Sequence, residues 1–198
     1  MSSKFDFLPQ LSFPDEEPLE VIYQTRLQGV TLSSDLTWSA HTQEITSRAS
    51  KKLWILVRFK ALGGNQEQLL SVYQLRIRST LEFASPVFHS SLTKDQSKRI
   101  EMVQKRAFAF ILGRNYNNYV SALTTLNQER LCTRREECCL NFAIKCSKSS
   151  RHRSMFPCNE NFRENMRFVK KFKEFFSRTS RHYNSSLPYM RRLLNKNT

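Results

Sequence analysis

Glycine is scarce in this chain, with four residues among 198. Tight turns and phosphate-binding loops depend on glycine, because it adopts positive φ without a steric penalty. So few glycines argue against an all-β fold and against a Gly-rich phosphate loop. Between residues 39 and 147 the apolar residues recur every three or four positions, which is the period of a helix with one buried face. We therefore predict a mainly α fold, a helical bundle of about five helices.

Residues that start or stop helices set the expected boundaries. The five helices are expected over residues 39–61, 66–83, 93–112, 120–126 and 128–147. Gly63 and Gly113 follow the first and third helices, where the last turn favours a residue that tolerates positive φ. Pro86 ends the second helix. Thr93 is the expected N-cap of the third, with Gln96 three residues later, as in a capping box.

The spacing also predicts which residues of each long helix form the core. The expected core residues are Ile45, Ala49, Leu53, Leu56 and Val57; Leu69, Leu70, Tyr73, Ile77 and Leu81; Ile100, Val103, Ala107, Phe110 and Ile111; and Leu131, Cys138, Phe142 and Ile144. Each group repeats at helical spacing, so its members share one face.

The two ends of the chain differ from its middle. Residues 1–18 combine prolines with acidic side chains, so we expect a disordered leader. Residues 19–32 are β-prone and Gly29 permits a bend, which predicts one or two short strands. Two strands alone are marginal in water, so this segment is expected to pair with something outside the chain. Residues 19–147 would form a helical domain, and residues 148–198 a basic, mobile C-terminal extension.

Phenylalanines alternate with Lys and Arg between residues 162 and 178. Aromatic rings of this kind can stack on unpaired bases while the cations follow the nucleic-acid backbone. However, Phe168, Phe172 and Phe175 also lie at helical spacing. We favour this second interpretation, a helix with a buried phenylalanine face, and leave the first open.

The net charge of +15 and the isoelectric point near 10.0 predict a polyanionic partner. Cations that neutralise phosphates release condensed counterions, which favours nucleic acid. Acidic protein surfaces are the alternative. The basic residues of the first helix are expected on the side opposite its apolar stripe. The expected nucleic-acid-binding residues are Arg48, Lys51, Lys52, Arg58, Lys98, Lys105, Arg106, Arg134 and Arg135.

The sequence holds no motif for catalysis, metal binding or membrane insertion. Two-metal polymerase or nuclease chemistry needs clustered carboxylates, whereas the acids of the helical region are isolated or lie beside bases. The five cysteines are too openly spaced for a zinc site. We therefore expect no metal, no cofactor and no small-molecule substrate. Neither a membrane span nor a signal peptide is evident, which favours the cytoplasm or the nucleus.

A series of short phrases occurs in order along residues 27–195. The phrases are LQGV (27–30), DLTWSAH (35–41), ASKKLW (49–54), VY (72–73), RIRS (76–79), LEFASPV (81–87), IEMVQKRA (100–107), ILG (111–113), LCTRR (131–135), FAIK (142–145) and LLN (193–195). Together they resemble the region that follows the palm in reverse transcriptases of non-LTR retrotransposons, jockey-like elements in particular. Two positions depart from that family: Gln28 replaces the usual Leu, and Phe88 the usual Trp.

This resemblance implies the thumb and C-terminal helical extension of an RNA-directed DNA polymerase, which grip the template–primer duplex. The fingers and palm, with their metal-binding aspartates, have no counterpart here. We therefore expect a non-catalytic fragment that binds RNA, DNA or a hybrid, with its opening strands packed on a palm. Three alternatives stay open: a fragment of a longer active polymerase, a structural or protein-interaction module, and a degenerate element product without a selected function.

Overall fold

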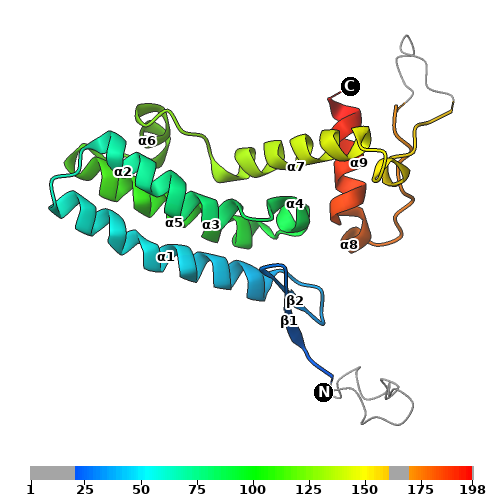
Figure 1. The fold of residues 1–198 in the computed structure, drawn as a ribbon, viewed down its shortest axis with the longest axis horizontal. Coiled ribbons are helices and arrows are strands. Elements are labelled where there is room, and N and C mark those ends of the chain that lie inside the picture. Colours follow the sequence, from blue (N-terminus) through cyan, green and yellow to red (C-terminus); the bar gives the residue numbers. More distant parts are fainter. Residues whose placement is uncertain (1–20, 161–169, 198) are drawn as a thin grey trace.

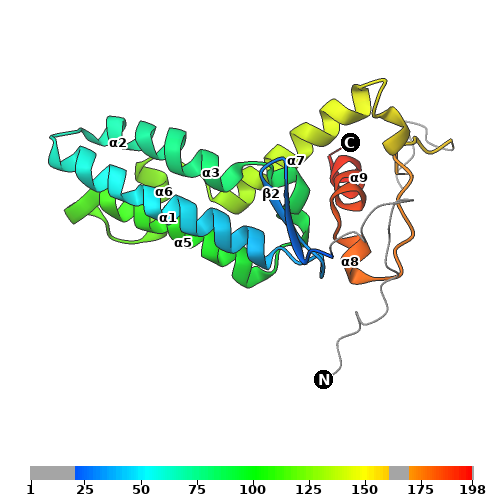
Figure 2. The ribbon, with the colours of Figure 1, turned by 60° about the horizontal axis from the view of Figure 1, so that its bottom comes forward.

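The computed structural model describes residues 21–160 and 170–197 (Figure 1). These residues form a mainly helical fold with one short antiparallel sheet near the N-terminus, which confirms the predicted fold class. The long helices of the first half lie side by side in a bundle, and a further long helix leads from the bundle to a smaller C-terminal part (Figures 1 and 2). The expected disordered leader lies outside the described residues.

Two strands and nine α-helices follow one another along the described residues. The strands are β1 (Gln24–Leu27) and β2 (Val30–Ser33), and the helices are α1 (Ser39–Ala61), α2 (Gln66–Val72), α3 (Ser79–Glu82), α4 (Ser85–Phe88), α5 (Lys94–Leu112), α6 (Tyr119–Thr125), α7 (Leu131–Lys148), α8 (Ser180–Tyr183) and α9 (Ser186–Lys196). A π-helical segment, Tyr73–Arg78, joins α2 to α3 without a break. Within the described residues, no helix combines the length and the apolar character that crossing a membrane requires.

The predicted helix boundaries are confirmed where capping chemistry specifies them. Gly63 follows α1 with φ +86°, and Thr93 accepts a hydrogen bond from the backbone of Gln96 in a complete capping box. Asn65 and Asn118 form equivalent boxes at the starts of α2 and α6. Each box satisfies backbone N–H groups that the first turn of a helix leaves without partners.

The two strands form a tight hairpin that rests on α1. Gln28 and Gly29 both have positive φ, at 50° and 82°, as a two-residue type I′ turn requires. Val30 of β2 is buried, and the Thr31 amide lies 3.3 Å from Nδ1 of His41 in α1. By contrast, all four residues of β1 are exposed. Only one strand of the hairpin is therefore covered by the bundle.

The π-helical segment keeps a four-residue apolar repeat on one face. Leu69, Tyr73, Ile77 and Leu81 are spaced by four and are each exposed by 2% or less. In a regular α-helix, residues four apart drift by about 40° around the axis, so three steps would turn Leu81 well away from Leu69. The wider π turns reverse this drift. The predicted helix over 66–83 thus exists, with a π segment that the sequence did not reveal.

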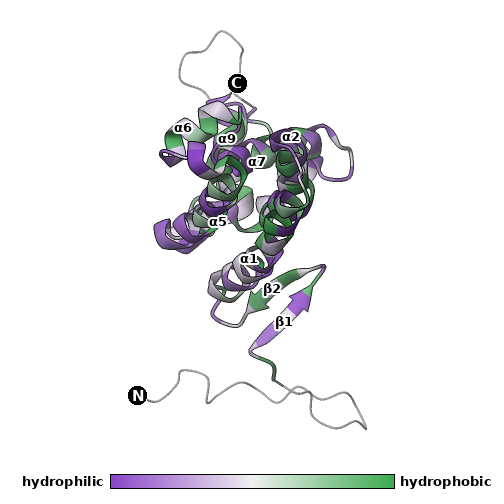
Figure 3. Cartoon of the chain, turned by 90° about the vertical axis from the view of Figure 1, so that its left-hand side faces the viewer, coloured by the Kyte–Doolittle hydropathy of each residue, from purple (hydrophilic) through white to green (hydrophobic). Residues whose placement is uncertain are grey.

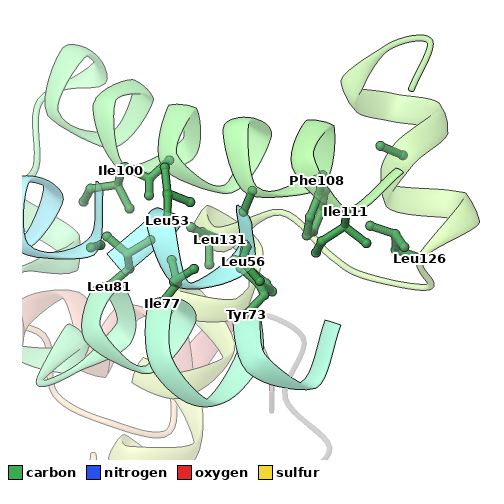
Figure 4. Packing of buried hydrophobic residues seen from close by; sticks show 14 of the residues in the cluster. Leu53, Leu56, Tyr73, Ile77, Leu81, Ile100, Phe108, Ile111, Leu126 and Leu131 are labelled. Atoms are coloured by element: carbon green, nitrogen blue, oxygen red, sulfur yellow. The ribbon is translucent and has the colours of Figure 1, made fainter. Parts of the chain in front are cut away.

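The main core lies between α1, the α2–α3 helix and α5, and α6 and the start of α7 close its far side (Figure 4). Most predicted core residues belong to it. The prediction is wrong for Val57, Phe110 and Phe142, which are exposed by 44%, 42% and 47%. It is also wrong for Cys138, because α7 buries Cys139 in its place. α5 buries Phe108 in place of Phe110. This is because α6 and α7 cover α5 from a second side and move the centre of its buried face. Seen end-on, hydrophobic and hydrophilic stretches alternate around α1 and α5 (Figure 3).

A second, smaller core holds the C-terminal part against α7. It consists of Ala143, Phe156, Phe172, Met190 and Leu194. The described parts of the expected mobile extension, residues 148–160 and 170–197, are therefore folded, because Phe156 and the apolar face of α9 pack against α7. The predicted helix through the phenylalanines is wrong: residues 170–179 are not helical, and Phe172 forms an isolated bridge with Cys158. Phe168 lies outside the described residues.

Candidate nucleic-acid interface

Four of the exposed cations of α5 form two pairs. Lys98 and Arg99 are followed seven residues later by Lys105 and Arg106, and all four are exposed. Seven residues are close to two helical turns, so the two pairs lie one above the other. The opposite side of α5 is held in the core by residues such as Ile100 and Ala107. Among the ion pairs of the described residues, none involves these four side chains.

The neighbouring helix α1 continues this charged surface. Lys51 and Arg58 are exposed and are again seven residues apart. Within the described residues, neither forms an ion pair with a carboxylate. Between them lies Trp54, whose side chain remains 63% exposed. The two helices pack along much of their length (Figure 2), so these exposed cations lie on adjoining helices. We call Lys51, Arg58, Lys98, Arg99, Lys105 and Arg106 the α1–α5 basic face.

A groove of about 310 Å³ runs between the two helices of this face. Its α1 wall consists mainly of small polar residues, Thr46, Ser47 and Ser50. Arg99 and Arg106 line the opposite wall on α5. Hydroxyl groups and guanidinium groups are donors that contact phosphate oxygens in protein–nucleic acid complexes. The groove therefore combines shape, charge and donors suited to a phosphodiester backbone.

Arg48 and Lys52 do not belong to this face, although the sequence placed them there. Both line a separate cleft on the side of α1 that faces the hairpin and α3. Arg48 pairs with Glu44, and Nζ of Lys52 donates to Oγ1 of Thr80 at 2.7 Å. The prediction that Arg48, Lys51, Lys52 and Arg58 lie together is wrong, because Lys52 lies beside the apolar stripe rather than opposite it.

Arg134 and Arg135 are also removed from the predicted surface. Nε of Arg134 lies 2.6 Å from a carboxylate oxygen of Glu82, and that hydrogen bond raises the pKa of the Arg134 guanidinium. Arg135 is wholly buried, and burial lowers the pKa of its guanidinium. Its Nη2 donates to Ser97 at 3.0 Å, and its Nε lies 3.4 Å from Nδ1 of His89. A side chain without solvent access cannot contact nucleic acid.

Sequence reasoning missed Arg99 and the exposure of Trp54. Arg99 repeats seven residues later as Arg106, just as Lys98 repeats as Lys105, so helical spacing could have marked this pair. Trp54 carried no such signal, because an apolar residue on a helix is more often buried than exposed. Its exposure became apparent only when the covered side of α1 was known.

The cysteines and histidines form no metal site in the part of the chain that the structure describes. There, no three His, Cys, Asp or Glu side chains are grouped so that they could hold an ion. The five cysteines are free thiols, and burial raises the pKa of the Cys139 thiol to about 12.

Comparison with known proteins finds no match: no family model, no curated protein and no solved structure is significantly similar to this chain. The relation to reverse transcriptases therefore stays a prediction from the sequence phrases.

Proposed function

We propose that this chain binds nucleic acid through the α1–α5 basic face, and that its role is binding without catalysis of its own. The observation that carries the proposal is the set of six exposed cations on two adjoining helices, none of them in an ion pair with the described carboxylates. Cations that solvate freely in the unbound state are available to replace counterions along a phosphate backbone.

The spacing of the cations allows contacts to separate phosphates of one strand. Arg99 and Arg106 are separated by about 10 Å along the axis of α5, which is close to the rise of three base pairs. Lys98 and Lys105 repeat the same interval beside them. The resemblance to the thumb of a reverse transcriptase suggests an RNA–DNA hybrid as the first ligand to test.

Salt dependence of binding tests the proposal. We expect the affinity for a fluorescent RNA–DNA hybrid, measured by anisotropy, to fall steeply with salt. The double variant Arg99→Gln/Arg106→Gln should lower the slope of log affinity against log salt by about two, since each lost phosphate contact removes roughly 0.9 from the slope. The matched control is Arg151→Gln/Arg153→Gln, which removes two exposed cations after α7.

The control separates a specific face from the general charge of the chain. Equal losses in the two double variants would contradict the α1–α5 basic face as the binding surface. An affinity that does not change with salt, or no binding at low salt, would contradict nucleic-acid binding by this mechanism.

A second candidate function, docking to another protein, is favoured by the hairpin. Tyr23 and Leu27 are exposed by 64% and 61%, and β1 pairs on one edge only within the described sheet. Exposed strand edges are templates for pairing with another chain. Partner capture that survives nuclease digestion and is lost in Tyr23→Ser/Leu27→Ser would favour this candidate. Capture that disappears on nuclease digestion would instead favour the first.

A further inference from the structure

The cleft beside the hairpin is a second basic site, apart from the α1–α5 basic face. It has a volume of about 370 Å³ and lies between β1, α1 and the α3 region. Three cations line it: Arg26 from β1, and Arg48 and Lys52 from α1. Ser79 and Thr80 line the opposite wall, and their hydroxyl groups donate to the backbone carbonyls of Leu75 and Arg76. These groups come from segments far apart in the sequence, so the fold creates the cleft.

The hairpin turn positions Arg26 over α1. Gly29 lies so close to Phe83 that an added Cβ would approach the ring to 3.0 Å, so a larger residue would push the hairpin away. This contact holds β1 across the cleft, with a guanidinium nitrogen of Arg26 3.6 Å from Glu44. Arg48 and Lys52 are one helical turn apart, so they point to the same side of α1. Lys52 is further oriented by its bond to Thr80.

The charges of the cleft do not cancel. Glu44 pairs with both Arg26 and Arg48, while Nζ of Lys52 donates to the neutral hydroxyl of Thr80. A hydrogen bond from Thr31 lowers the pKa of Glu44, so this carboxylate stays ionised at neutral pH. Three cations against one carboxylate leave a net charge of +2. A concave site with that charge is suited to a dianion.

We infer that this cleft binds a phosphate monoester. A monoester carries about 1.5 to 2 negative charges at neutral pH, which matches the net charge of the cleft, whereas a phosphodiester carries about one. The two guanidinium groups offer planar pairs of donors for phosphate oxygens, and the Lys52 ammonium adds a point charge. The Phe83 ring, 54% exposed at the edge of the cleft, offers a surface for the group that the phosphate carries.

Binding of methyl phosphate, followed through the amide resonances of the ¹⁵N-labelled full chain, tests the inference without any nucleic acid. We expect chemical-shift changes at the amides of Gly29 and Thr80. Dimethyl phosphate, which is similar in size but carries one negative charge, should bind more weakly. Binding should also weaken at pH 5, since the second pKa of a monoester is about 6. Dimethyl phosphate that binds as tightly as methyl phosphate, or no shift at Gly29 and Thr80, would overturn the inference.

Two variants identify the residues responsible. Lys52→Met keeps the length of the side chain and removes its charge, and should weaken methyl phosphate binding about tenfold or more, as expected for a lost charge-assisted contact. Arg26→Gln, on the exposed strand, should have a similar effect and leaves the helices untouched. Lys145→Met is the matched control, because Lys145 is an exposed lysine of α7 that lies outside both the cleft and the α1–α5 basic face. Equal weakening by Lys145→Met and Lys52→Met would refute the assignment.

Oligonucleotides distinguish a free nucleotide from the end of a strand as the source of the monoester. A preference for a 5′-phosphorylated strand over its 5′-hydroxyl form, abolished by Lys52→Met, would assign the cleft to a strand end. Methyl phosphate and nucleotide binding without that preference would assign it to a free nucleotide. Loss of oligonucleotide binding in Arg99→Gln/Arg106→Gln with methyl phosphate binding intact would show that the two sites are independent.

Discussion

Mild acid should destabilise the fold through His89. The imidazole of His89 is partly buried: its Nδ1 lies 3.4 Å from Nε of the buried Arg135 on α7, and its ring packs edge to face against Tyr189 of α9, with centroids 5.9 Å apart. Burial, and secondarily the charge of Arg135, lower the pKa of His89 from 6.5 to about 4. The protonated ring would therefore be poorly hydrated and would lie next to the positive charge of Arg135.

The size of the effect follows from the two pKa values. Above pH 6.5 the ring is neutral in both the folded and the unfolded chain, so its titration does not change the free energy of unfolding. Between pH 6.5 and about 4 the unfolded chain binds a proton that the folded chain excludes, so stability falls as the pH falls. The loss amounts to about 2 kcal/mol at pH 5 and to about 3 kcal/mol below pH 4.

Urea unfolding at pH 7.5 and at pH 5.0 measures this loss. Carboxylates and His41 also titrate toward acid pH, so the wild type is compared with His89→Gln, which keeps a hydrogen-bond acceptor near Arg135 but does not titrate. The wild type should lose about 2 kcal/mol more than the variant between the two pH values. His182→Gln, which removes an exposed ring, should behave like the wild type. Identical losses in the wild type and in His89→Gln would refute the reasoning.

Three further predictions concern stability, measured by chemical denaturation. Phe108→Ala should cost about 3–5 kcal/mol because the ring is wholly buried against Tyr73, whereas Phe176→Ala, at a ring 84% exposed, should change stability by less than about 0.5 kcal/mol. Thr93→Ala should cost about 1 kcal/mol through loss of the capping box of α5; an unchanged midpoint would contradict that role. Gly113→Ala should cost about 1–3 kcal/mol, because φ +56° with ψ −119° is unfavourable for a residue with a Cβ.

The helices and their ends could be predicted from the sequence because local chemistry decides them. Gly63 and Thr93 act within one turn of their own position, and so does the Gln28–Gly29 turn of the hairpin. The α1–α5 basic face was partly predictable for the same reason: residues seven apart on a helix share a side whatever the rest of the chain does. The sequence by itself thus determined the mainly helical class, the main helix boundaries and most of the basic residues that share a side of α1 or α5.

The tertiary structure decided which side of each helix is covered, since that depends on segments far away in the chain. Arg135 lies in the buried stripe of α7 because α4 and α5 pack over it, and Lys52 faces a cleft because the hairpin folds back across α1. Phe108 replaces Phe110 in the core because α6 and α7 approach α5 from a second direction. Periodicity shows that a helix has faces, but the burial of a given face is a property of its neighbours, and these are brought together only when the chain folds.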